Sequence, residues 1–509
     1  MALAKVTENS KNCAIEIKHD NELGRYLVTS RDIQPGEIII NEAPLIKGPA
    51  QVTGPVCLSC LKNLKEDDHS TCSKCGWPLC NDDYCHDSAR HVAECDWTVN
   101  KRKQKVQIKQ FITPHRTYEC ITTLRCLYQR EHNPAVWKKL MELESHCGKR
   151  QGTEQYESDK RIIAQFLNRF FKIESADFSE NDVLKICGII QVNGHEVPLT
   201  SPAHVAIYEI ASMLEHSCVP NCNKSFSNDG ELLIRATRFI PAGEHISICY
   251  TDPLWSTINR LEHLAVTKFF LCQCIRCTDP TELGTYYSAI NCFNKKCRGF
   301  IVPHSNGEKK RNKVIPDPKW ECLTCKTEHS KTEVNKVLNQ IAYDFSMTNK
   351  HDPSSCEIFL NHYKNNGLLH PNHYFLSNVR LKLAQLYGQT TENDVQSLSD
   401  LNLQRKMDLC FQMLEFATLL YPAEWRIHGV LKFELHATVA EDARRKMIKG
   451  EIDCDNLKLQ LLESKKWLNE TVFHLKYEPD NLPEGKIAKQ AERNLEDLER
   501  LLTKMYFQL

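Results

Sequence analysis

Cysteine is the residue type with the most chemistry to offer in this sequence. The chain has 509 residues and 25 cysteines, many in the short pairs that hold zinc as thiolates in reducing compartments. The densest group supplies eight donors between residues 57 and 95: Cys57, Cys60, Cys72, Cys75, Cys80, Cys85, His91 and Cys95. Eight donors suffice for two tetrahedral zinc ions, which would stabilise a segment too short to build an apolar core.

Two further cysteine groups lie downstream. Cys272, Cys274 and Cys277 supply three thiolates in six residues and need a fourth, for which Cys218 is the candidate. The last group flanks an apolar strand-like segment, 299–303, and predicts a zinc ribbon; a cysteine-rich loop without metal is the open alternative. Its members are Cys292, Cys297, Cys322 and Cys325.

Charge and hydropathy exclude several classes of partner. Lys plus Arg and Asp plus Glu each number 65, so the formal net charge is zero and no overall field would attract nucleic acid or anionic lipid. Residues 1–12 contain no apolar run, which predicts no signal peptide and no myristoylation site. No stretch approaches the ~20 apolar residues of a membrane span. We expect a soluble intracellular protein.

The elements that must position these residues fall into three parts. Short alternating runs in 23–46 and 232–252, the first broken at Pro35-Gly36, predict strands joined by tight turns. Segment 104–190 carries helix-type patterns. After residue 330, helical periods predict either tetratricopeptide-like hairpins or an irregular helical bundle. These helices span 373–387, 406–421, 425–447, 457–477 and 487–509, with Pro371, Pro422, Pro479 and Pro483 expected in the connections.

Several motifs in this order resemble one known family. They are Arg31-Asp-Ile-Gln-Pro-Gly-Glu, His216-Ser-Cys-Val-Pro-Asn221, Gly243-Glu-His-Ile-Ser-Ile-Cys-Tyr250 and the Cys-x-Cys-x2-Cys group. With the eight-donor finger inserted, the chain resembles a divergent, arthropod-like member of the SMYD family, whose SET domain is split by a MYND zinc finger. The implied fold is α+β and multidomain. Its parts are the SET amino-terminal part (1–48), the MYND finger (49–98), a helical insert (99–190), the SET carboxy-terminal part (191–252), a post-SET segment (253–280), the zinc ribbon (288–328) and a tetratricopeptide-like helical domain (330–509).

The resemblance also implies ligands and roles. Interleaved MYND pairing would place Cys57, Cys60, Cys80 and Cys85 on one zinc ion and Cys72, Cys75, His91 and Cys95 on the other, with a third ion in the post-SET segment and a fourth in the ribbon. The implied activity is S-adenosylmethionine-dependent methylation of lysine in a histone or another protein, with Tyr250 as catalytic residue. The implied cofactor residues are Gly24, Arg25, Tyr26, Asn193, Glu215, His216, Asn221, Tyr250 and Phe270.

Three residues depart from the family pattern. Tyr26 replaces the second glycine of Gly-x-Gly, so a side chain stands where the backbone usually approaches the cofactor. Glu215 replaces an asparagine and would either help the sulfonium or repel the cofactor's carboxylate. Lys268 replaces a second tyrosine and would disfavour an incoming protonated lysine, unless a register shift brings Phe269 or Phe270 to the channel instead.

The departures keep two functions open. One is a protein-lysine methyltransferase with altered specificity. The other is a catalytically weak or inactive adaptor or transcriptional corepressor whose MYND finger binds proline-containing peptides. A metal-dependent hydrolase is excluded because no open three-ligand zinc site has a carboxylate base beside it, as in H-E-x-x-H. We expect a monomer in the cytoplasm and nucleus, with no nucleic-acid or membrane partner.

Overall fold

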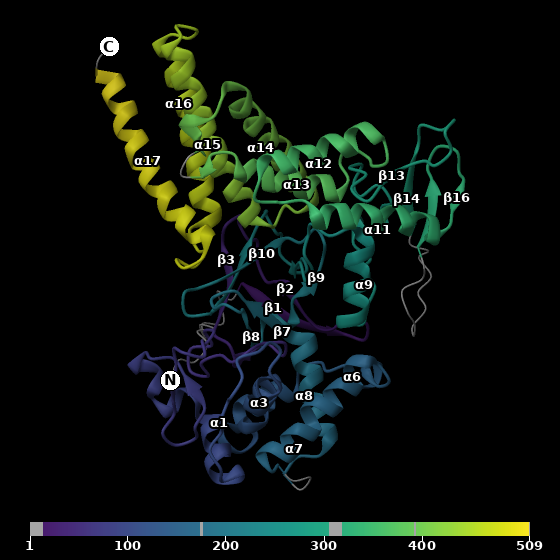
Figure 1. Ribbon diagram of the computed structural model, residues 1–509, viewed down its shortest axis with the longest axis vertical. Coiled ribbons are helices and arrows are strands. Elements are labelled where there is room, and N and C mark those ends of the chain that lie inside the picture. Colours follow the sequence, from purple (N-terminus) through teal and green to yellow (C-terminus); the bar gives the residue numbers. More distant parts are fainter. Residues whose placement is uncertain (1–13, 174–176, 305–317, 391–392, 508–509) are drawn as a thin grey trace.

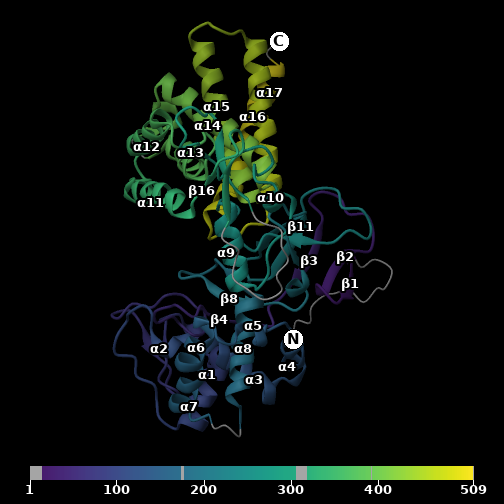
Figure 2. The same cartoon turned by 90° about the vertical axis from the view of Figure 1, so that its right-hand side faces the viewer.

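The computed structural model describes residues 14–173, 177–304, 318–390 and 393–507. The expectation for residues 1–12 therefore lies outside the described residues. Short strands form the middle of the molecule, with the cysteine-rich finger and a helical insert on one side and the carboxy-terminal helices on the other (Figure 1). The view turned by 90° shows the same succession (Figure 2). None of the described helices is both long and apolar enough to cross a membrane.

The central strands come from both ends of a long insertion. β3 pairs antiparallel with β11, and β4 pairs antiparallel with β8, so chain segments on either side of the finger and the helical insert share sheets. β9 and β12 pair in parallel. These strands are β1 (Ile15–Asp20), β2 (Gly24–Thr29), β3 (Ile38–Glu42), β4 (Ile46–Pro49), β7 (Gly194–Val197), β8 (His204–Ile207), β9 (Glu215–His216), β10 (Cys222–Phe226), β11 (Leu232–Ala236) and β12 (Ser247–Ile248).

The turn between β2 and β3 follows from its sequence. Gly36 has φ of +86°, a left-handed conformation that glycine adopts without steric cost. Its amide donates to the carbonyl of Ala236 at 2.8 Å, which attaches the turn to β11. Expected and observed strands agree here, although the run ending at Tyr250 contains only the two-residue strand β12.

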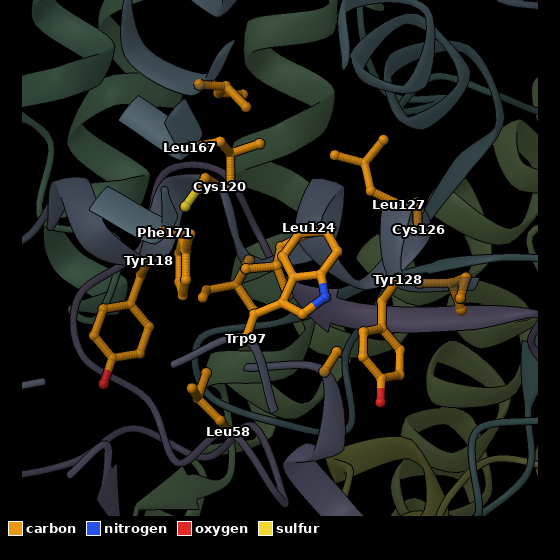
Figure 3. Close-up of a cluster of buried hydrophobic side chains, with 14 of the residues drawn as sticks. Leu58, Trp97, Tyr118, Cys120, Leu124, Cys126, Leu127, Tyr128, Leu167 and Phe171 are labelled. Carbon is orange, nitrogen blue, oxygen red and sulfur yellow. The ribbon is translucent and has the colours of Figure 1, made fainter. Parts of the chain in front are cut away.

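The finger and the helical insert share one hydrophobic core. Figure 3 shows Leu58 and Trp97 of the finger together with Tyr118, Leu124 and Phe171 of the insert. The finger elements are β5 (Ser70–Thr71), β6 (Pro78–Leu79), η1 (Asp83–His86), η2 (Ser88–His91), α1 (Val92–Trp97) and η3 (Thr98–Arg102). The insert elements are α2 (Arg116–Glu119), α3 (Ile121–His132), α4 (Pro134–Met141), α5 (Cys147–Arg150), α6 (Glu154–Asp159), η4 (Lys160–Ala164), α7 (Gln165–Phe171) and α8 (Glu180–Asn193). The finger thus gains apolar support that its own length does not provide.

Beyond the central strands, a short helical segment precedes a four-stranded antiparallel sheet. The helical segment contains α9 (Thr257–Thr267) and α10 (Ile275–Thr278). The sheet has the order β13-β14-β15-β16, with bounds β13 (Ile290–Asn291), β14 (Phe300–His304), β15 (Lys319–Cys322) and β16 (Glu328–His329). The apolar run 299–303 lies mostly in β14, as the sequence predicts.

The carboxy-terminal region is helical, and two of its helices were not expected. They are α11 (Lys331–Met347) and α12 (Pro353–Asn366). The remaining elements are α13 (Tyr374–Leu386), β17 (Gln389–Thr390), β18 (Asn393–Asp394), η6 (Val395–Ser397), α14 (Asp400–Leu420), α15 (Trp425–Ile448), α16 (Cys454–Leu475) and α17 (Pro483–Phe507). Placing Pro483 in a connection was wrong: it is the first residue of α17, where its missing N–H costs nothing.

The carboxy-terminal helices are attached to the central strands through buried polar contacts. The guanidinium of Arg235 on β11 is buried, donates to the carbonyl of His474 at 3.0 Å, and lies 4.5 Å from the ring centroid of Trp425. Asn223 on β10 donates to the carbonyl of Ala423 at 3.1 Å. The helical region is therefore anchored on the three-stranded sheet of β10, β11 and β3.

Candidate functional site

Tyr250 lies two residues beyond β12 and is held by the segment around β9. Its hydroxyl donates to the carbonyl of Leu214, and its backbone amide donates to Nδ1 of His216 at 3.0 Å. The ring centroids of His216 and Tyr250 are 5.2 Å apart, and those of His216 and Phe270 are 5.9 Å apart. Burial raises the pKa of Tyr250 above its ordinary value, so the hydroxyl stays protonated and able to donate.

Asn221 attaches its own segment to the chain that leads into β12. Its amide nitrogen donates to the carbonyl of His245 at 2.8 Å and to the carboxylate of Glu244 at 2.9 Å, while its oxygen accepts from the amide of Ser247 at 2.9 Å. The side chain is buried. Its observed role is to join the 221 segment to β12, and the contact with a cofactor implied by the resemblance stays a prediction.

Three other expected cofactor residues lie at element ends. Gly24 and Arg25 begin β2, and Asn193 is the last residue of α8. Gly24 has φ of +73°, and a Cβ placed on it would meet no atom within 4 Å, so open space borders its backbone. Arg25 donates to the carbonyl of Glu142 at 2.8 Å. Asn193 is buried and donates to the carbonyls of Glu144 at 2.8 Å and Ile189 at 2.9 Å.

Two of the unusual residues, Tyr26 and Glu215, meet at one histidine. The ring of Tyr26 stacks on His245 with centroids 4.7 Å apart and planes 13° apart. The Nδ1 atom of His245 lies 2.5 Å from Oε1 of Glu215, within ion-pair distance. His245 is brought there because Val28 of β2 bridges to it. Sequence reasoning missed this residue, whose only signal is its place within Gly-Glu-His-Ile.

The third unusual residue, Lys268, lies beside the ring of Tyr250. Its Nζ donates to the carbonyls of Val192 at 2.7 Å and Gln191 at 3.3 Å, and lies 5.7 Å from the ring centroid of Tyr250. Burial, with a smaller contribution from Lys224, lowers the pKa of Lys268 to about 8. The sequence left open whether Lys268, Phe269 or Phe270 lines the channel. Lys268 lies beside the ring of Tyr250, Phe270 lies 5.9 Å from the ring of His216, and Phe269 packs 5.5 Å from the ring of His146.

The expected zinc ligands gather into four quartets. In each quartet the donor atoms lie within 4.8 Å of one another: Cys57, Cys60, Cys80 and Cys85; Cys72, Cys75, His91 and Cys95; Cys218, Cys272, Cys274 and Cys277; Cys292, Cys297, Cys322 and Cys325. A tetrahedron with zinc–sulfur bonds of ~2.3 Å has edges of ~3.8 Å. The sulfur–sulfur distances of 3.8 Å for Cys60 and Cys80 and 3.7 Å for Cys297 and Cys322 fit that size.

The third quartet, which we call the post-SET cluster, supports the Tyr250 site directly. Sγ of Cys218 lies 3.3 Å from Nε2 of His216, the histidine that contacts Tyr250. The buried guanidinium of Arg260 donates to Sγ of Cys218 at 3.2 Å and pairs with Glu282 at 3.2 Å. Four thiolates on one divalent ion would carry a net charge of −2, and Arg260 would offset part of it.

Comparison with known proteins identifies the central region. Residues 24–251 match the SET domain family model. Isoform B of the SET domain-containing protein SmydA-8 of Drosophila melanogaster is 31% identical over 316 residues, covering 59% of this chain and 64% of that protein. Its isoform A is 29% identical over 309 residues, covering 59% of this chain and 63% of that protein. The histone-lysine N-methyltransferase SMYD3 of Mus musculus is 28% identical over 269 residues, covering 50% of this chain and 59% of that protein.

The matched regions thus span less than two thirds of each relative's length. The SET match over residues 24–251 covers most of the central strands, the finger and the helical insert. Three of the four donor quartets have members within these residues. The chain is a SET-domain protein related to members of the SMYD family.

Proposed function

We propose that this chain is an S-adenosylmethionine-dependent protein-lysine N-methyltransferase. The observation that carries the proposal is the position of Tyr250, whose hydroxyl is held by the carbonyl of Leu214 beside His216 and Phe270. Relatives from Mus musculus and Homo sapiens bear the name histone-lysine N-methyltransferase, which supports the same reaction class. The protein partner is any protein that presents a lysine to this site.

The residues around Tyr250 suit the proton and charge requirements of the reaction. A bound S-adenosylmethionine supplies an activated methyl group to a neutral amine. Free lysine, with a pKa near ~10.4, offers little neutral amine at pH 7. Removal from water lowers that pKa, as it does for Lys268 beside the same tyrosine. The Tyr250 hydroxyl and nearby carbonyls would orient the amine, and such positioning is worth up to ~7–11 kcal/mol.

The residues present fit the cofactor. The open space at Gly24 lets a ligand approach the backbone, and the rings of His216 and Phe270 lie next to Tyr250. The two departures do not oppose this fit, since Tyr26 stacks on His245 and the Glu215 carboxylate is paired with it. Gly24, Arg25, Asn193, His216 and Phe270 would hold the cofactor, with Tyr26, Glu215 and Asn221 shaping its surroundings.

We further propose that the four quartets hold four zinc ions. Thiolates with one histidine are the donor set that zinc prefers, and the donors already lie at tetrahedral spacing. The two finger ions would fix residues 57–95 on the insert, and the ion of the post-SET cluster would hold Cys218 and therefore His216. The fourth would close the ribbon formed by β13–β16. Reduced thiolates fit a location in the cytoplasm and nucleus.

The test is methyl transfer by zinc-loaded protein to a peptide library that carries a fixed lysine. Tyr250→Phe should lower kcat by about a hundredfold or more, because the amine loses its orienting hydroxyl. Tyr343→Phe is the matched control, since Tyr343 is 61% exposed on α11 and should leave activity unchanged. Zinc content and melting temperature should match the native protein in both variants. Equal activity of the Tyr250→Phe variant would contradict the assignment of Tyr250.

A second candidate function is an adaptor whose finger binds proline-containing peptides. It is favoured by one observation, the placement of Lys268 on carbonyl oxygens beside Tyr250, which opposes entry of another lysine. Peptide capture that is lost in Cys57→Ser and retained in Tyr250→Phe would support it. Capture that is indifferent to Cys57 would contradict it.

A further inference from the structure

Lys268 is bound as an incoming amine would be. Its Nζ uses the carbonyl oxygens of Val192 and Gln191 rather than a carboxylate as acceptors. It also lies 5.7 Å from the ring centroid of Tyr250, within the range of a cation–π contact. These are the kinds of groups, backbone carbonyls and a tyrosine, that the proposed reaction needs around its target lysine.

The position is fixed by the chain on both sides of Lys268. Lys268 directly follows Thr267, the last residue of α9, and precedes the cysteines of the post-SET cluster. Its amide donates to the carbonyl of Leu264 at 2.8 Å. Phe269 follows with φ of +62°, a left-handed conformation that a non-glycine residue rarely adopts, and its carbonyl accepts from Lys149 at 3.3 Å. The backbone turn therefore directs Lys268 and Phe269 to opposite neighbours, Tyr250 and His146.

We propose that Lys268 occupies the target-lysine position of this enzyme, so that an external lysine enters only after Lys268 leaves the carbonyls of Gln191 and Val192. This inference rests on the proposed methyltransferase function. It makes Lys268 a residue that limits which substrates are accepted, and it predicts a low basal activity toward free lysine peptides.

The electrostatic surroundings favour displacement over shared occupancy. Burial is the main cause that lowers the pKa of both Lys268 and His195, and the charge of Lys224 lowers both further. A second ammonium beside Lys268 would add a further like charge in a desolvated place. The substrate must therefore compete with Lys268 for the same oxygens.

The kinetic test compares the native protein with Lys268→Tyr, Lys268→Met and Lys268→Arg, using the fixed-lysine peptide library and measured cofactor affinity. The two neutral variants should raise kcat/KM by about tenfold or more, while Lys268→Arg, which keeps the cation, should not. Cofactor affinity should stay within about twofold in all four proteins. Because tyrosine and methionine differ in shape, a folding defect in one would not be reproduced in the other.

Amine labelling gives a readout that needs no substrate. With limiting acylating reagent at high pH, where its lowered pKa gives Lys268 no advantage, Lys268 should be modified at least about tenfold more slowly than Lys149, which is exposed and also donates to a carbonyl. Equal labelling rates, or neutral variants no more active than the native protein while cofactor binding is intact, would overturn the proposal. Failure of every variant to bind cofactor would instead overturn the proposed methyltransferase function.

Discussion

The two sides of Tyr250 accommodate their unusual residues in different ways. On the side of Gly24, Tyr26 and Glu215 are both satisfied by His245, one by stacking and one by a hydrogen bond. On the side of α9, Lys268 is held by backbone carbonyls and repelled by Lys224. On the first side, the unusual side chains have partners of their own. On the second side, Lys268 itself uses the carbonyl oxygens beside Tyr250. A substitution therefore has to be judged by what its new side chain contacts, since three departures in one site have different consequences.

The largest expected effect tests whether both sides depend on the post-SET cluster. Cys218→Ser should reduce methyl transfer more than about a thousandfold and abolish cofactor binding, because Cys218 contacts His216 and its partner Cys272 lies two residues after Phe270. Cys297→Ser in the ribbon is the matched control and should change activity less than about threefold. Activity assays on both variants with measured zinc content decide the point. If both variants lost methyl transfer equally, the effect of Cys218→Ser would reflect unfolding of the whole protein and not a specific role of the post-SET cluster.

A smaller effect should be confined to the cofactor side. His245→Ala should weaken S-adenosylmethionine binding about thirtyfold, or ~2 kcal/mol, because it leaves the Glu215 carboxylate unpaired near the cofactor's own carboxylate. Adding Glu215→Asn to the same protein should restore most of the affinity. His263→Ala, which removes a histidine packed on Trp255, is the control. Calorimetry that finds no rescue by Glu215→Asn would break the pairing argument.

The smallest effect concerns the charges that face Lys224. Burial raises the pKa of Glu424 to about 7, above its ordinary value of 4.5, despite the opposing influence of Arg426 and Lys224. Because the folded state holds the proton more tightly, Glu424 lowers stability as pH rises from 4.5 through 7. Glu424→Gln should therefore raise the free energy of unfolding by ~1 kcal/mol at pH 8 and by little below pH 4.5. Denaturant titrations of both proteins at each pH measure the difference, and a gain that does not depend on pH would contradict the assigned pKa.

Ligand chemistry made much of the metal-site geometry predictable. The short cysteine spacings predict the zinc sites, and the resemblance to the MYND finger implies how the donors from Cys57 to Cys95 divide between two ions. The structure assembles the same quartets. Zinc occupancy stays a prediction. The strands near Pro35-Gly36 and the later carboxy-terminal helices were predictable because apolar periodicity and turn residues act locally.

The contact partners of the unusual residues could not be predicted from the sequence, because these partners are distant in the chain or are backbone atoms. The partner of Tyr26 is His245, more than 200 residues away, and only the bridge from Val28 reveals it. Lys268 could be assigned to the site by resemblance, but its acceptors are backbone carbonyls, which carry no residue signature.

The most direct test of this account is calorimetric titration of S-adenosylmethionine into zinc-loaded native protein and its Tyr26→Gly variant. If the cofactor side is complete, the native protein binds with micromolar affinity and the variant gains no more than a few fold. No binding by the native protein, with binding gained in Tyr26→Gly, would show that Tyr26 closes the pocket and would contradict the account.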